Sequence, residues 1–217
     1  GATLEETFTV APPCQCAPDQ ILPIADIVAM YAAPAENDNA AIGLSADALM
    51  DPPGPINLQL PCGKYYLSGI RTTQPLSIVV TGRTALFIGG NIDSSAKLQV
   101  SLTSQGELDI LIAGTITTQN ELTLGSRAYP ALMRVYLGGS TLTLSNATTV
   151  GAYVYAANAA VSLNNIVEIF GGLVAGSIQA ENKVRVHYDR AVLSVGENCP
   201  GNPPGEDCDS CLDCGNQ

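Results

Sequence analysis

One short apolar segment follows another between Leu76 and Asp189, and glycines separate many of them. Most of these segments are about four to six residues long, near the usual length of a β-strand, and the intervals leave no room for helices. The segments are Leu76–Val80, Ala85–Ile88, Leu98–Leu102, Leu108–Ile112, Leu122–Leu124, Leu132–Leu137, Leu142–Leu144, Ala152–Tyr155, Val161–Leu163, Val167–Phe170 and Val184–His187. This pattern predicts an all-β fold and favours a right-handed parallel β-helix, or β-solenoid.

A weak internal repeat supports the solenoid. Leu86–Ile92 recurs as Ile110–Ile116 and as Val135–Thr141, at spacings of about 24–25 residues that are typical of solenoids. Phe170–Val174 is a looser copy. Each copy combines a strand, a glycine corner and the start of another strand, and we expect glycine there because it reaches positive φ without a steric cost. The alternative is an antiparallel sandwich, but the glycines recur in step and Asn-Gly hairpin turns are absent.

The net charge of −11 limits the partners of the chain. It argues against nucleic acid and against anionic membrane surfaces, because both repel an acidic protein. No apolar run approaches the roughly 18 residues of a membrane span. No basic segment precedes an apolar stretch at the start, so we expect that any signal peptide has been removed. The sequence indicates no cofactor.

Seven cysteines flank the repeats, and their use predicts disulfide bonds formed in an oxidising compartment. They are Cys14, Cys16, Cys62, Cys199, Cys208, Cys211 and Cys214. The spacing of the last three also occurs in iron–sulfur and zinc sites, so they are weak metal-ligand candidates, and free thiols remain a third alternative. Because seven is odd, one cysteine is free, bonded to another chain, or paired with a residue outside this sequence.

Three parts follow from this organisation. We expect residues 1–75 to form a lead-in or cap, 76–195 to form the solenoid, and 196–217 to form a Cys-rich tail, for which truncation or processing is one interpretation. In the lead-in, Gln20–Tyr31 predicts a short helix with Asp19 as its N-cap, and Asn37–Asn39 predicts a turn. Thr3–Val10 predicts an extended strand.

That strand, with Leu4, Phe8 and Val10, is a candidate for donation to a neighbouring molecule by β-augmentation. Copies linked in this way, end to end, would build a filament that does not close on itself. The alternative is that the same strand caps its own chain.

Several short sequence motifs resemble those of an uncharacterised β-helical domain of secreted and envelope proteins, common in myxobacteria and their relatives. These motifs are Cys14-x-Cys16, Asn37–Leu44, Leu60–Leu67, Thr81–Phe87, Arg134–Gly139, Tyr155–Ala159 and Val186–Asp189. Similar domains occur in proteins related to the type IV pilus protein PilX. The resemblance covers about residues 12–215 and implies a β-helix outside the cytoplasm. It supplies no activity and no catalytic residues.

Two groups of residues invite a catalytic interpretation. His187, Tyr188 and Asp189 are an acid–base combination, but adjacent strand residues point to opposite sides, which favours a structural role in the last coil. Glu107 and Asp109 alternate with Leu108 along a strand, so their side chains lie on the same face. Enzymes that cleave polysaccharides also place two carboxylates on one surface. An ion pair with Arg83 or Arg134 is the favoured interpretation.

The sequence therefore predicts a non-enzymatic extracellular protein with a structural or adhesive role. It is a cell-surface module or the subunit of a fibre, and its partners are other copies or other envelope and pilus proteins. Two alternatives stay open: a carbohydrate-active β-helix that binds or cleaves polysaccharide, and a metal-binding Cys-rich tail on a scaffold.

Overall fold

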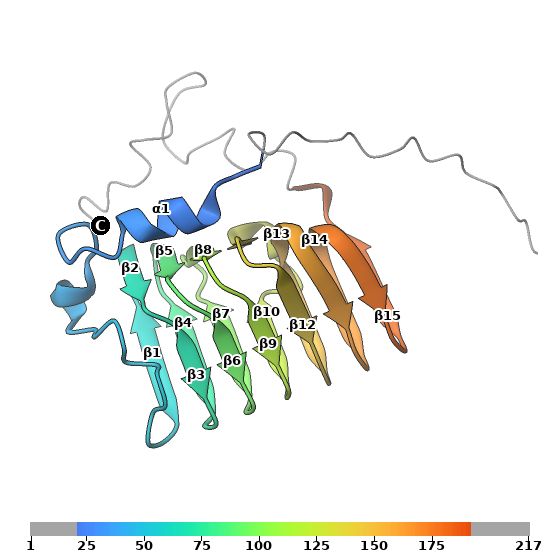
Figure 1. Cartoon of the computed structure of the whole chain (residues 1–217), viewed down its shortest axis with the longest axis horizontal. Helices are drawn as coiled ribbons and strands as arrows, with labels where there is room; N and C mark the ends of the chain where they lie inside the picture. The colour runs from blue at the N-terminus through green and yellow to red at the C-terminus, as the bar shows by residue number, and fades with distance from the viewer. Residues whose placement is uncertain (1–20, 192–217) are drawn as a thin grey trace, which may run out of the picture.

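The computed structural model describes residues 21–191, which form a parallel β-solenoid of about six turns. Each complete turn contributes one strand to each of three faces (Figure 1). We name these faces A, B and C in the order in which the chain reaches them. Because every strand lies beside the equivalent strand of the next turn, the sheets run along the axis of the solenoid.

The strands can be listed by face. Face A holds β1 (Ile56–Leu60), β4 (Leu76–Val80), β7 (Leu98–Leu102), β10 (Leu122–Gly125), the first part of β13 (Thr148–Leu163), the first part of β14 (Val167–Ala180), and β15 (Val184–Tyr188). Face B holds β2 (Gly63–Leu67), β5 (Arg83–Ile88), β8 (Glu107–Ile112), β11 (Met133–Leu137) and the middle of β13 and β14. Face C holds β3 (Ile70–Thr72), β6 (Ile92–Ser94), β9 (Ile116–Thr118), β12 (Thr141–Leu144) and the ends of β13 and β14.

The predicted apolar segments all lie in strands or overlap them, so the all-β parallel fold is confirmed. The predicted boundary at residue 76 is wrong, because β1, β2 and β3 already complete a turn between Ile56 and Thr72. The sequence pattern missed this turn because its first strand alternates apolar residues with Asn57 and Gln59, which breaks the apolar run.

The repeat has the predicted register. Leu86 pairs with Ile110, and Ile110 pairs with Val135, on neighbouring turns of face B. The looser copy does not belong to this row, because Phe170 pairs with Gly151 on face A. Here the strand-then-glycine pattern misled the prediction, since β14 runs through its corner without a break.

In the three closer copies, glycines lie at the predicted corners, but the reason predicted for glycine at these corners, a positive φ, is wrong. Positive φ is found at Gly43, Gly63, Gly125 and Gly171, and the glycines of these three copies are not among them. A Cβ atom added to Gly139 would overlap the carbonyl oxygen of Gly114 in the turn before. Glycine is required at this corner because stacked backbones approach closely.

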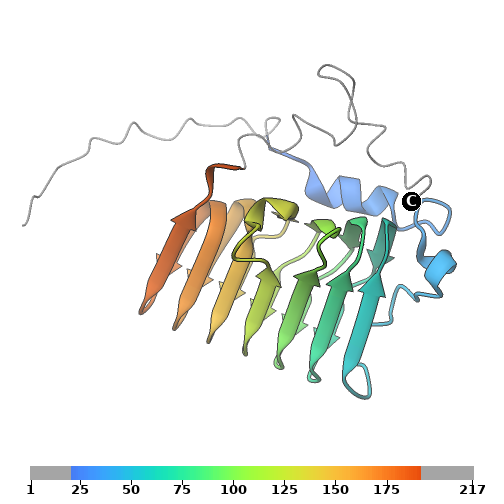
Figure 2. The same ribbon diagram turned by 180° about the vertical axis from the view of Figure 1, so that it is seen from behind.

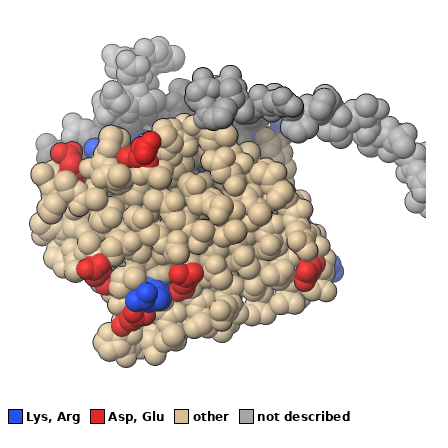
Figure 3. Space-filling view, in the orientation of Figure 1, with Lys and Arg blue, Asp and Glu red and all other residues tan. Residues whose placement is uncertain are grey.

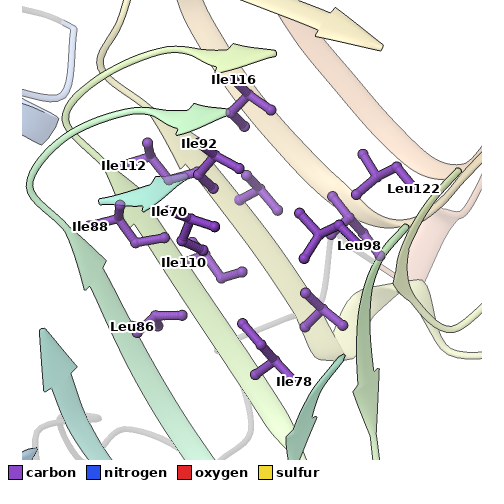
Figure 4. Close-up of a pocket in the computed structure, with 13 residues that line it drawn as sticks. Ile70, Ile78, Leu86, Ile88, Ile92, Leu98, Ile110, Ile112, Ile116 and Leu122 are labelled. Carbon is purple, nitrogen blue, oxygen red and sulfur yellow. The ribbon is translucent and has the colours of Figure 1, made fainter. Parts of the chain in front are cut away.

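The interior is filled by aliphatic side chains from all three faces. In Figure 4, Ile70, Ile88 and Ile112 point toward the same central space as Leu98 and Leu122. Only about 20 Å³ remains empty among them. Burial of each such side chain stabilises the fold by roughly 1.5–3 kcal/mol, so the stacked turns hold one another together.

The helix α1 (Ile24–Met30) lies along the outside of face B, as Figures 1 and 2 both show. It buries Ile24 and Val28 against Phe87. The helix begins later than the predicted Gln20, directly after Pro23, because the residue before a proline avoids the helical conformation. The predicted N-cap Asp19 lies outside the described residues.

Two short 3₁₀ helices complete the described chain. The first, η2 (Asn39–Ile42), precedes β1, and the second, η3 (Pro130–Leu132), lies at the corner between β10 and β11. Between residues 21 and 191, no helix is long and apolar enough to cross a membrane.

Candidate functional site

The last turn of the solenoid is incomplete in the part of the chain that the structure describes. The strand β15 covers β14 on face A only, so β14 forms the edge on faces B and C. In Figures 1 and 2, β15 lies at the opposite end of the stack from β1. We call this end the open end and define it by residues 172–188.

Side chains that point inward at the open end are exposed. Val186 is 58% exposed, whereas Ile169, its partner one turn earlier, is 1% exposed. Ile178 is 55% exposed, whereas its partner Val161 is 1% exposed. These residues continue the rows that build the core, and they are exposed because no further turn covers them among the described residues.

A cavity of about 640 Å³ lies at the open end, lined in part by Leu163, Leu173 and Val184. It lies where no further strand among the described residues covers β14 on faces B and C. Cavities of this size and apolar character are typical of binding sites.

The other end of the solenoid is covered on face B. We call residues 38–51 the edge layer, because they lie against the outer edges of β2 and β3. The Asp38 N–H donates to the carbonyl oxygen of Lys64 (2.7 Å), and the Lys64 N–H donates to the Asp38 carboxylate (2.8 Å). The Asn39 side chain donates to the Tyr66 carbonyl (2.7 Å) and accepts from the Tyr66 N–H (2.9 Å). The two side chains therefore replace a neighbouring strand.

The edge layer continues along face C. The backbone N–H of Arg71 donates to the Leu49 carbonyl (3.0 Å), and the Asp51 N–H donates to the Arg71 carbonyl (2.8 Å). Leu49 is buried in the core. The sequence predicts only a turn at Asn37–Asn39. It gives no local signal for the edge layer, because Asp38 and Asn39 bind residues 26 and 27 positions away in β2.

Face A has no such cover at this end. Among residues 21–191, β1 pairs with β4 alone, and the sheet ends there. Its inward residues Ile56 and Leu58 are only half-buried, whereas Leu76 and Ile78 in the next turn are buried. The edge of β1 is therefore a second candidate site for pairing.

Charge differs between the two ends. The open end and the three residues after it carry three basic residues, Lys183, Arg185 and Arg190, and two acidic ones, Glu181 and Asp189. The edge layer carries three aspartates and no basic residue. Two of these charges are already paired, Arg185 with Glu168 and Asp51 with Arg71. On the side of the molecule seen in Figure 3, charged side chains are few and broad areas carry none.

The two predicted carboxylates do share the outside of face B, and one arginine binds both. The Arg134 guanidinium donates to Glu107 (2.6 Å) and to Asp109 (2.9 Å). Burial opposes the charge of Arg134, but these hydrogen bonds outweigh it and hold the arginine pKa above its ordinary value. The same burial, with the charge of Asp109, raises the pKa of Tyr136. The cluster matches the expected ion pair.

His187 takes part in a stack of aromatic rings. It lies parallel to Phe170, with ring centroids 4.4 Å apart, and it pairs with Phe170 in the sheet. Tyr188 pairs with Gly171, so neighbouring residues point to opposite sides of the strand. The carbonyl of Asp189 accepts a hydrogen bond from the Tyr153 hydroxyl. These contacts attach the last turn to the turns before it.

The remaining predicted site residues are mostly beyond the described part of the chain. Cys62, at the corner between β1 and β2, is disulfide-bonded. The other six cysteines and the segment with Leu4, Phe8 and Val10 lie outside the described residues. Within residues 21–191, no group of three His, Cys, Asp or Glu side chains is placed to hold a metal ion.

Comparison with known proteins gives one match. No curated protein and no solved structure matches this chain. Residues 20–195, which contain every strand described above, match a family model described as a domain of unknown function, DUF7305, and the chain belongs to that family.

Proposed function

We propose that this protein is a non-enzymatic structural or adhesive module that acts outside the cell. It is displayed on the surface or built into a fibre, and it associates with its partner through the open end. The observation that supports the proposal best is the exposure of core-type side chains at that end. Exposed apolar surface next to unpaired strand edges is a typical template for association.

The extracellular location is supported by the cysteines. Seven cysteines in one chain favour an oxidising compartment, and Cys62 is disulfide-bonded. The resemblance to β-helical domains of secreted and pilus-associated proteins points the same way. We further propose a right-handed winding, which connections between parallel strands strongly prefer. The negative charge supports a partner other than nucleic acid.

Sedimentation of the oxidised full chain over a range of concentrations tests the association. We expect species larger than the monomer, and we expect the double variant Ile178→Asp, Val186→Asp to weaken association at least tenfold. Charges placed on this surface would have to be desolvated on contact. Ile166→Asp is the matched control, because Ile166 is 57% exposed but lies in the turn between β13 and β14. A chain that stays monomeric at all concentrations, or a control that weakens association equally, would contradict the proposal.

A carbohydrate-active role is the second candidate, and the shared face of Glu107 and Asp109 supports it. It predicts that Glu107→Gln and Asp109→Asn reduce binding or cleavage of acidic or neutral polysaccharides without unfolding the domain. Polysaccharide co-sedimentation and reducing-end assays would measure this. Because Arg134 already holds both carboxylates, we rank this role below the structural one. The third candidate, a metal-binding tail, is tested by metal analysis of the oxidised full chain.

A further inference from the structure

We infer that the open end binds the edge layer and β1 of a second copy, so that copies stack head to tail. The inference rests on the proposed function and names the partner of the same site. In the contact, β15 of one copy pairs with β1 of the next. The edge layer of the next copy fills the recess beside β15.

The two ends of the solenoid have complementary shapes, because at each end the three faces stop at different levels along the axis. At the open end, face A extends one strand beyond faces B and C, because β15 is present on face A alone. At the other end, the edge layer extends faces B and C, and β1 leaves face A one layer short. A copy placed on the open end along the same axis would therefore meet a matching surface on all three faces.

The backbone N–H and C=O groups at the two ends are also oriented for pairing between copies. The N–H groups of inward residues on face A donate toward the following turn: Ile56 to Pro75, Leu76 to Lys97, Leu98 to Glu121 and Val167 to Lys183. In a parallel sheet, successive residues direct their N–H and C=O groups to opposite neighbouring strands. The inward residues Val184 and Val186 therefore present these groups at the open end. The outward residues Asn57 and Gln59 present theirs at the edge of β1. Parallel pairing of β15 with β1 would satisfy both sets.

Side chains and charges favour the same arrangement. The inward row that ends at Val184 and Val186 would continue with Ile56 and Leu58 of the next copy, and all four side chains would lose exposed surface. The acidic edge layer would face Lys183 and Arg185 of the open end, which also carries Glu181. Two edge layers placed against each other would instead bring like charges together.

The contact joins two different surfaces, so it does not close and builds a fibre. Within residues 21–191, face A of each copy contributes seven strands. At roughly 4.8 Å per strand, the axial repeat of the fibre is about 34 Å. Electron microscopy of the oxidised chain would measure this repeat directly.

Photo-cross-linking tests the pairing. A benzophenone amino acid replaces Asn57, whose exposed side chain points away from the core, in a mixture of light and isotopically heavy full chains. We expect light–heavy cross-links from position 57 to residues 183–188. The same probe at Ser77, one turn inside the stack, is the control and should give none. Asn57→Pro, which removes an N–H at the edge, should weaken association at least tenfold, and Asn57→Ala should not.

The outcomes separate the two proposals. Cross-links from 57 to residues 56–60 of another copy would show head-to-head contact and overturn the inference. Cross-links to residues 1–20 or 192–217 of the same copy would show that the chain covers its own edge, and would also overturn it. Association that depends on Ile178 and Val186 but gives no cross-link to 183–188 overturns the inference and leaves the proposed function standing. A chain that stays monomeric overturns both.

Discussion

The ring of Tyr31, just after α1, stacks on the ring of Phe87 in face B, with centroids 3.7 Å apart and planes 9° from parallel. The ammonium group of Lys64 lies over the same tyrosine, 5.6 Å from the centre of its ring. The stack attaches the helix to an outward row of apolar and aromatic residues in which Tyr66, Phe87 and Leu111 are in register.

Phe87→Ala should lower the free energy of unfolding by about 3–4 kcal/mol, because Phe87 is buried between the helix and the sheet. Tyr31→Ala should cost less, because part of this ring is exposed. Chemical denaturation of both variants and their double variant would give a coupling of about 0.5–1.5 kcal/mol for the ring pair. Additive effects would mean that the two rings stabilise the helix independently.

Arg134→Gln should destabilise the domain by about 1–3 kcal/mol, because it leaves two neighbouring carboxylates without their shared partner. Arg71→Gln is the matched control. Arg71 pairs with Asp51, but both side chains are more than half exposed, so we expect a much smaller loss of stability. Equal losses in thermal denaturation at neutral pH would show that Arg134 has no special structural role.

Gly139→Ala should destabilise the domain strongly, by about 2 kcal/mol or more, because the new methyl group would overlap the Gly114 backbone of the previous turn. Gly54→Ala is the control, since no atom lies within 4 Å of the added carbon. If both variants unfold at the same denaturant concentration as the parent protein, stacking at this corner is looser than the structure indicates.

Acidification should loosen the attachment of β15. A hydrogen bond from Arg185 lowers the pKa of Glu168, and Arg127 adds to the effect. A carboxyl group whose pKa is lowered by folding stabilises the folded state above its unfolded pKa of about 4.3, and this contribution is lost as the pH falls through the folded value. The protection factors of the β15 amides, which correct for the intrinsic pH dependence of hydrogen exchange, should therefore fall below about pH 4.

Glu168→Gln provides the control for this acid effect. The glutamine variant should show lower protection factors in β15 at neutral pH and no further fall that depends on this group. A parent protein whose β15 protection factors stay constant down to about pH 3 would show that the ion pair does not hold the strand.

The sequence predicts the regular part of this fold well and the two ends poorly. Alternation in Leu108–Ile112 and the recurring corners identify stacked parallel strands, because only stacking buries such short strands. The open end was missed because Ile178 has the same character as any core residue. Its exposure depends on how many turns follow. The edge layer was missed because Asp38 and Asn39 act through long-range hydrogen bonds to β2, which no local pattern records.

The corners of the solenoid absorb differences in chain length while the register of the faces is kept. Paired residues are 26 positions apart between Leu122 and Thr148, but 17 apart between Val167 and Val184. The long turn carries its additional residues, η3 among them, at the corner between β10 and β11. Evolution can therefore lengthen or replace such a corner without disturbing the strands. Members of the family should differ most in loop length at this position, and a new surface can be added there while the scaffold is inherited unchanged.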